Sequence, residues 1–325
     1  MLTNKQLSNR IKDLDKYLLE KYRKESKKEA KKKKRDYKEY EREFMRRIKT
    51  VIGNLNPLII EATNIEVYQG KGRPPKISLE QRLRIFLIKQ LIDKSNRMMA
   101  YLLDIFCLVI GIDISYKTIE RLYSNEDLKL ALHNLHRLLI KEKGIKEVDA
   151  GGDSTGYGLT IRKHYASHVQ KLKEKSKKQD ARKKKKHFVF NFALMDLKTR
   201  MYVCYGSSLK SEKDAYKKAM KMLKEQDIKL NSLRLDKYYS FPSYVKEHKG
   251  VKFYLIPRSN AKVGDGEDWL NVMKEFVDDT WDYLKEYYKR NNSENGFAVD
   301  KKLFGWKIRQ KIEDRIDTAV FSKTL

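Results

Sequence analysis

The hydrophobic pattern of the chain changes its period near residue 145, and this change limits the folds open to it. Before that point, apolar residues recur at helical spacing. After it, short apolar runs typical of strands are separated by turn residues and by one capped helix, Ser211–Glu225. The expected strands are Lys146–Gly152, Phe188–Asp196, Arg200–Tyr205, Leu233–Asp236 and Lys252–Ile256, and a long helix is expected over Trp269–Lys289. This order predicts an α/β domain with a mixed sheet flanked by helices, preceded by an all-helical region.

Positive charge limits the partners of the chain. Of its 325 residues, 73 are Lys or Arg and 44 are Asp or Glu, which gives a formal net charge of +29. A surplus of this size favours a polyanion, with nucleic acid before anionic lipid or the ribosome. The most apolar stretch, Leu102–Ile112, is too short to span a bilayer, and no apolar leader precedes it. Two cysteines form no disulfide framework, so we expect a reducing, cytoplasmic compartment. From the apolar pattern we expect no membrane contact, and from the charge we expect association with the nucleoid when the protein is bound to DNA.

Two clusters of basic residues lie outside the apolar pattern. Lys21–Arg35 holds ten Lys or Arg among fifteen residues, within an expected helical N-terminal arm, residues 1–70. Neither Pro nor Gly occurs from Met1 to Val51, which favours one long helix in this arm. Lys171–Lys186 holds ten basic residues among sixteen and falls between two expected strands. Each cluster fits a nucleic-acid backbone, and each also fits a solvated charged helix or loop.

Residues 71–140 have the pattern of a helical DNA-binding region. The segment Lys71–Lys76 is basic and extended by its two prolines, and its Gly-Arg-Pro sequence resembles a minor-groove hook with Arg73 at its centre. Two apolar helices follow, one over Leu79–Ile92 and one that runs to about Val109.

A short polar helix completes this region. Ser115 is expected to cap a helix over Tyr116–Tyr123. In a helix-turn-helix protein the last helix faces the base edges, so Lys117 and Arg121 are the expected DNA contacts. A small helical bundle without DNA-binding function has the same pattern.

Two of the expected strands end in an aspartate, Asp153 and Asp236. Neighbouring strands of a mixed sheet can bring two such carboxylates together, although an Asp after a strand is more often a cap or turn residue. Two divalent cations that activate water for an in-line displacement need several carboxylates, one of them bridging. Because no cluster of His or Cys accompanies the aspartates, we expect two Mg²⁺ or Mn²⁺ ions rather than zinc.

Helical geometry suggests a third carboxylate, Glu294. Tyr287, Arg290, Glu294 and Lys301 fall within about 60° of one another on a helix of about 100° per residue. A carboxylate between two cations and a phenol suits a metal-bound phosphodiester, with Arg290 and Lys301 on phosphates and Tyr287 on a phosphate or sugar. The asparagines and the glycine around Glu294 are poor helix formers, so this helix is expected to bend or break there, and a break would end the shared face.

These residues carry a family resemblance. The spacing Tyr-x2-Arg-x3-Glu-x6-Lys resembles the signature of IS4-type (IS4/IS5 superfamily) DDE transposases. The Gly-Gly-Asp-Ser-Thr-Gly sequence at Asp153 and the Leu-Asp-Lys-Tyr-Tyr-Ser sequence at Asp236 resemble the two aspartate motifs of that family. Tyr254-x2-Pro257-Arg258-x-Asn260 resembles its following strand, and the resemblance covers about residues 145–305.

The resemblance implies an RNase H-like catalytic core, here residues 145–325. It further implies that Asp153, Asp236 and Glu294 are the metal-binding catalytic triad and that Tyr287, Arg290 and Lys301 bind the DNA end. Asp149 lies in the strand of Asp153 but outside the motif, so a structural role is expected for it.

The predicted function is that of an insertion-element transposase. Such an enzyme binds double-stranded DNA, both the terminal repeats of the element and the target, and is expected to act as a homodimer on DNA. Metal-activated water hydrolyses the phosphodiesters at the element ends, and the freed 3′-hydroxyl attacks the target. One alternative is a catalytically inactive or repurposed DNA-binding protein derived from a transposase. Another is a structural RNA-binding protein such as a ribosome-associated factor.

Overall fold

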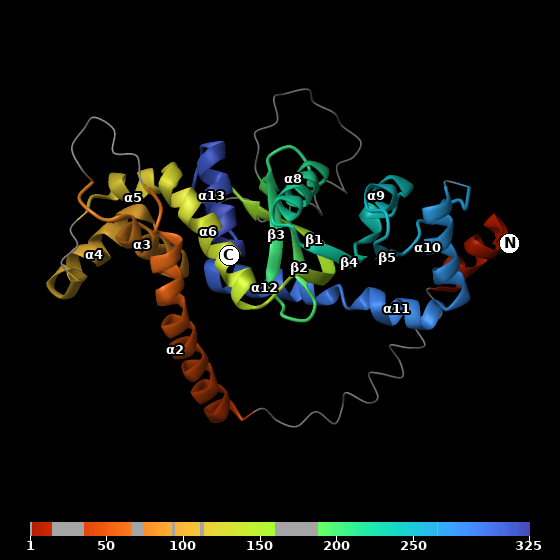
Figure 1. Cartoon of the computed structure of the whole chain (residues 1–325), viewed down its shortest axis with the longest axis horizontal. Coiled ribbons are helices and arrows are strands. Elements are labelled where there is room, and N and C mark those ends of the chain that lie inside the picture. Colours follow the sequence, from red (N-terminus) through yellow and green to blue (C-terminus); the bar gives the residue numbers. More distant parts are fainter. Residues whose placement is uncertain are drawn as a thin grey trace. The chain divides into compact units, whose positions relative to one another are not determined.

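The computed structural model describes residues 2–14, 36–66, 75–92, 95–110, 114–159, 188–264 and 266–325 (Figure 1). The two basic clusters, Lys21–Arg35 and Lys171–Lys186, and the predicted hook residue Arg73 lie outside these ranges. Within them, no helix has both the length and the apolar character that crossing a membrane requires.

The chain folds into two compact units, each drawn from separate parts of the sequence. Unit 1 comprises Met1–Leu55, Val148–Gly152 and Leu230–Asn291. Unit 2 comprises Asn56–Glu147, Asp153–Lys229 and Asn292–Leu325.

The described helices before residue 145 are α2 (Tyr37–Ala62), α3 (Leu79–Ile92), α4 (Asn96–Ile110), α5 (Tyr116–Leu122) and α6 (Glu126–Glu142). The expected helices at α3, α4 and α5 are present, whereas α6 was not predicted. The predicted cap is confirmed, because the Ser115 side chain accepts a hydrogen bond from the Thr118 N–H at 3.4 Å. A helix over residues 4–14 is anchored in unit 1, where the Val263 N–H donates to the Asn4 side chain at 2.9 Å.

The strands form one mixed sheet. They are β1 (Glu147–Gly158), β2 (Phe188–Asp196), β3 (Tyr202–Ser208), β4 (Lys229–Arg234) and β5 (Lys252–Tyr254). The five strands lie in the order β3-β2-β1-β4-β5. β2 and β3 pair antiparallel, as the predicted hairpin requires, and β4 and β5 pair parallel. The sequence prediction of a mixed α/β sheet is therefore confirmed, and the strand order is compatible with an RNase H-like core.

The position of Asp153 differs from the prediction. It was expected at the end of a strand, but β1 continues through both glycines and on to Gly158, so Asp153 lies in the middle. Strand β1 has hydrogen-bonded neighbours on both sides, which hold the backbone extended through Gly151 and Gly152. Strand-forming residues such as Thr155 and Tyr157 then continue it.

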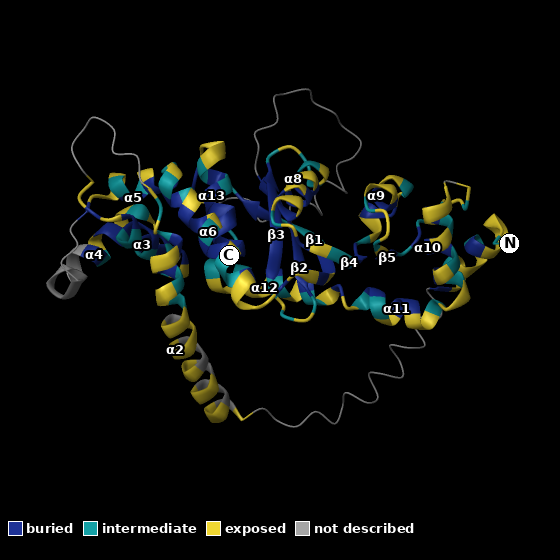
Figure 2. Cartoon of the chain, viewed as in Figure 1, coloured by how far each residue is buried: buried dark blue, intermediate teal, exposed yellow. Residues whose placement is uncertain are grey.

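In unit 2, helices cover both faces of β2 and β3 (Figure 2). α8 (Glu212–Glu225) is capped by Ser211, as predicted. It packs on one face of the two strands, where Phe192 and Tyr216 meet edge-on with ring centroids 5.1 Å apart. α13 (Glu313–Thr324) lies on the other face, where Phe321 stacks on Tyr205 at 4.5 Å. Strand residues alternate between the faces, so Tyr205 faces α13 and Gly206 faces α8.

In unit 1, the expected long helix is divided into α10 (Glu267–Asp278) and α11 (Thr280–Tyr288), followed in unit 2 by α12 (Asn291–Phe304). The break after α11 has a specific cause. The buried Arg234 donates from Nε to the Glu286 carbonyl at 2.9 Å, the carbonyl that a continuous helix would offer to the Arg290 N–H. The Arg290 N–H instead bonds the Tyr287 carbonyl at 3.0 Å.

This break contradicts the prediction that Tyr287, Arg290, Glu294 and Lys301 share one helix. Tyr287 belongs to α11 and Arg290 to the connection, whereas Glu294 and Lys301 belong to α12. The bend or break expected around Glu294 is found at Lys289 and Arg290, directly before Asn291, whereas α12 runs unbroken through Gly296.

Candidate functional site

Unit 1 places Asp236, Tyr287 and Arg290 together. Asp236 follows β4 and begins the short helix η1 (Lys237–Tyr239). The Arg290 Nη2 lies 4.0 Å from the Asp236 Oδ1, and the Arg290 side chain is 9% exposed whereas that of Asp236 is 45% exposed. Tyr287 is buried, and the guanidinium carbon of Arg290 lies 5.7 Å from the centroid of its ring. Burial raises the pKa of the Tyr287 hydroxyl to about 12. A reachable carboxylate thus lies beside a fixed cation and a phenol that stays protonated at neutral pH.

Unit 2 places Asp153 beside Lys301. Asp153, Thr155 and Tyr157 alternate onto one face of β1. The Lys301 Nζ donates to the Thr155 hydroxyl at 2.5 Å and lies 5.5 Å from the centroid of the Tyr157 ring. Burial lowers the pKa of Lys301, and the negative charge of Asp153 partly offsets this effect. A second carboxylate of the predicted triad is therefore also accompanied by a cation of the predicted motif.

Helix α12 carries Glu294 and Lys301, which are seven residues apart and so share one side of the helix. The helix approaches the sheet closely at Gly296. A Cβ atom there would lie 2.5 Å from the Met195 Cε and 2.5 Å from the Tyr202 hydroxyl oxygen. At the next residue, Phe297 stacks on Tyr202 with ring centroids 5.5 Å apart. A glycine that is poor for helix propensity is thus required here by packing.

The prediction from sequence missed a buried polar cluster beneath α12. Asp300 lies against Tyr202, and burial raises the pKa of the Asp300 carboxyl to about 6. Lys323 of α13, 4% exposed, donates to the carbonyls of Phe304 and Gly305, the latter at 3.0 Å, and so holds the end of α12. The only sequence feature that could have pointed to this buried cluster is the position of Asp300, next to Lys301.

Replacing Asp300 by Asn is expected to remove a pH-dependent loss of stability. The folded pKa of about 6 exceeds the ordinary value of 3.8, so the free energy of unfolding falls as pH rises between these two values. At about pH 8 the Asp300→Asn chain should be more stable than wild type by about 1–2 kcal/mol, and at about pH 4 no more stable. Urea unfolding at both pH values measures this, and a difference that does not change with pH would contradict it.

The donor set suits a hard cation, but the described residues do not form a closed cluster. Asp153, Asp236 and Glu294 offer only carboxylate oxygens, which Mg²⁺ and Mn²⁺ prefer. Within the described ranges, no three His, Cys, Asp or Glu side chains are close enough together to hold a metal ion. Asp149, by contrast, accepts a hydrogen bond from Ser232 on β4, a structural contact of the kind expected for it.

The predicted DNA contacts of the helical region are on the surface of unit 2. Lys117 and Arg121 are both exposed on α5, while Ile119 and Leu122 on its other side are buried. The polar side of α5 thus faces outward, as it would both in a helix-turn-helix reader and in a helical bundle without DNA-binding function.

Taken together, these observations define an α/β protein in which carboxylates beside a mixed sheet are accompanied by basic side chains. Comparison with known proteins identifies its family. The chain is 44% identical over 287 residues to the "Probable transposase for insertion sequence element ISA1214" of Archaeoglobus fulgidus, a match that covers 87% of this chain and 84% of the relative. The chain therefore belongs to the insertion-sequence transposases. No protein-family model matches it, and no solved structure gives a significant match.

Proposed function

We propose that this chain is a DDE transposase of the IS4 type, which cleaves DNA at the ends of its element and joins them to a target with the help of divalent metal ions. Asp153, Asp236 and Glu294 would hold two Mg²⁺ or Mn²⁺ ions, which supply an activated water and stabilise the leaving oxygen. Arg290 and Lys301 would bind the phosphates that flank the scissile bond, and Tyr287 would bind a phosphate or sugar.

One observation carries this proposal: in each unit, a carboxylate of the motif lies beside a cation of the motif. Arg290 faces Asp236 at 4.0 Å, and Lys301 contacts Thr155, two residues along the strand from Asp153. The two aspartates are 83 residues apart in the sequence, and each has a partner from the short segment that ends at Lys301.

Divalent cations would offset the like-charge repulsion among the three carboxylates when the DNA end binds. During this step the phosphates of the DNA end would take over Arg290 and Lys301. Protein side chains would then orient the strand for attack by a water molecule that the bound ions activate.

The experiment is cleavage of a duplex that carries the terminal inverted repeat, taken from the genomic flanks of the element. Full-length protein is incubated with Mg²⁺, with Mn²⁺ or with a chelator, and the 5′- and 3′-labelled strands are resolved. Cleavage that ends in a 3′-hydroxyl and needs the metal supports the proposal. Binding of the repeat without cleavage under any of these conditions would favour the alternative, a DNA-binding protein derived from a transposase.

A further inference from the structure

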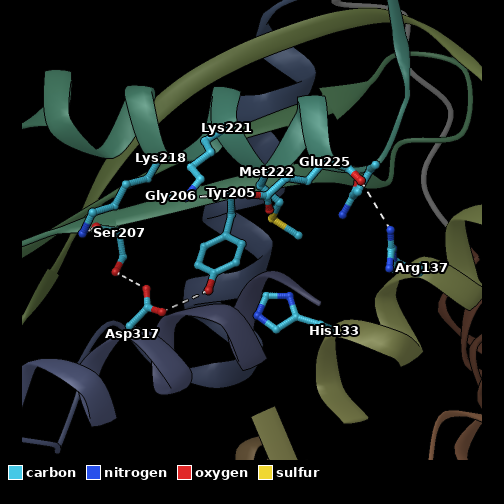
Figure 3. A pocket seen from close by; sticks show the side chains of 11 residues that line it. His133, Arg137, Tyr205, Gly206, Ser207, Lys218, Lys221, Met222, Glu225 and Asp317 are labelled. Atoms are coloured by element: carbon cyan, nitrogen blue, oxygen red, sulfur yellow. Dashed lines mark hydrogen bonds and ion pairs between the residues drawn. The ribbon is translucent and has the colours of Figure 1, made fainter. Parts of the chain in front are cut away.

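Helix α8 borders a groove along the β3 edge of the sheet, as formed by the described strands. β3 is the last strand of the sheet, and a cavity of about 440 Å³ lies between it and helices α6, α8 and α13 of unit 2 (Figure 3). Lys218 of α8 donates from Nζ to the Ser207 carbonyl at 3.0 Å, which occupies an edge carbonyl that another strand could use. Arg137 of α6 lies across the groove and donates to the Glu225 carbonyl at 3.3 Å.

The carboxylate in the groove is already bound by hydroxyl groups. Asp317 of α13 accepts hydrogen bonds from the Ser207 hydroxyl at 2.6 Å and from the Tyr205 hydroxyl at 3.3 Å. Figure 3 shows Asp317 directed at these two groups of β3. Its charge is thus turned toward the strand, which leaves the basic side chains of α6 and α8 at the outer rim.

The outer side of α8 is a row of lysines, which we call the α8 lysine stripe: Lys213, Lys217, Lys221 and Lys224. All four are exposed. At about 100° and 1.5 Å per residue, they fall within an arc of about 80° and extend over about 16 Å. One acidic residue of the first turn, Asp214, is directed away from the stripe, at the Ser208 hydroxyl 2.7 Å away.

This arrangement works against the stability of the helix. Lys213 with Lys217, and Lys217 with Lys221, are like charges four residues apart, each pair destabilising by about 0.2–0.5 kcal/mol. Lys221 has a carboxylate partner, Glu225 at 3.8 Å, but both side chains are largely exposed, so the ion pair contributes little. Among the described residues, no ion pair is formed by Lys213, Lys217 or Lys224. A helix that served only solubility would intersperse charges of both signs on its exposed side.

We propose that the α8 lysine stripe, together with Arg137 across the groove, binds the phosphate backbone of duplex DNA. This inference rests on the action of the chain on DNA, and only the position of the surface relative to the cleaved bond rests on the proposed role of Asp153. One strand of DNA carries a phosphate about every 3.4 Å along the axis, so a stripe of about 16 Å spans about five phosphates. The surface belongs to the edge strand β3, and β2 separates that strand from β1 and Asp153. It therefore contacts a part of the DNA away from the cleaved bond.

The test measures how DNA binding depends on salt. The quadruple variant Lys213→Gln, Lys217→Gln, Lys221→Gln, Lys224→Gln keeps helix propensity and removes four charges. A matched control removes four other exposed lysines of unit 2: Lys141→Gln, Lys143→Gln, Lys146→Gln, Lys229→Gln. Dissociation constants of full-length proteins for a labelled duplex of random sequence are measured by fluorescence anisotropy over a range of KCl concentrations.

We expect the α8 variant to bind at least tenfold more weakly at low salt and to reduce the slope of log K against log salt by about 3–4, one unit for each lost phosphate contact. The control should change the slope by less than one unit. Urea unfolding should show that the α8 variant is at least as stable as wild type, since two like-charge pairs are relieved.

Equal slopes for the two variants would overturn the proposal, because the lysines would then act only through the overall charge. So would a loss of slope that appears with single-stranded RNA but not with duplex DNA. These outcomes are separate from the fate of the catalytic proposal: a chain without metal-dependent cleavage can still show the salt effect, and a cleaving enzyme can lack it.

Discussion

Asp153→Asn and Asp236→Asn are each expected to reduce metal-dependent cleavage of a terminal-repeat duplex by more than about a thousandfold, equivalent to about 4 kcal/mol of transition-state stabilisation. An amide has nearly the same shape as a carboxylate but lacks the charge that holds a divalent cation. The loss should therefore appear in the rate of strand cleavage rather than in folding. Duplex binding should be retained or become tighter, since one negative charge near the phosphates has been removed.

The chain supplies a matched control for this experiment. Asp149 lies on the same strand as Asp153, four residues earlier, and bonds Ser232. Asp149→Asn makes the same chemical change on β1 and should cleave within about tenfold of wild type, because it removes one structural hydrogen bond and no metal ligand. An equal loss in Asp149→Asn and Asp153→Asn would show that the activity depends on the integrity of β1 and would count against the assigned triad.

Local chemistry predicted much of the fold. Ser115 and Ser211 each precede a polar first turn with a free backbone N–H two or three residues ahead, so both caps could be placed from the sequence alone. The hairpin of β2 and β3 was predictable for the same reason, since two apolar runs flank a short polar turn. These features depend on residues that are close together in the chain.

The features that were predicted wrongly depend on residues far apart. The end of α11 is set by Arg234, 52 residues before the carbonyl that it takes from the helix. Gly296 is a helix breaker by propensity, yet α12 continues through it because Met195 and Tyr202 leave no room for a side chain. Helix α13 gave no signal at all: it is buried on nearly every side from Ile316 to Thr324, so its apolar residues do not form the one-sided stripe that identifies a surface helix.

The candidate site was predicted by residue type better than by geometry. The four residues of the motif were expected to share one helix face, and the break before α12 shows that this reasoning was wrong. The pairings of Arg290 with Asp236 and of Lys301 with Thr155 arise from the packing of separate segments. Periodicity within one segment contains no information about such contacts, which is why Asp300 and Lys323 were also missed.

Gly206→Ala is expected to destabilise unit 2 by about 3 kcal/mol or more, the upper range for an overpacked core. A Cβ atom at this position would lie 2.0 Å from the Ala215 carbonyl oxygen and 2.5 Å from the Ala219 nitrogen. Both are backbone atoms of α8, so no change of side-chain rotamer can relieve the clash. The helix as a whole must move away from β3, and the contacts of Tyr216 with Phe192 would be lost with it.

Gly264→Ala is the matched control, because a Cβ atom there meets nothing within 4 Å. It should leave the urea midpoint unchanged or raise it slightly, through the reduced freedom of the unfolded chain. If Gly206→Ala unfolded at the same urea concentration as Gly264→Ala, α8 could not be packed on β3 as closely as described. The comparison also bears on the α8 lysine stripe. One side of α8 is in backbone contact with the sheet at Gly206, and the lysines lie on the opposite side, so they can be replaced without cost to the fold.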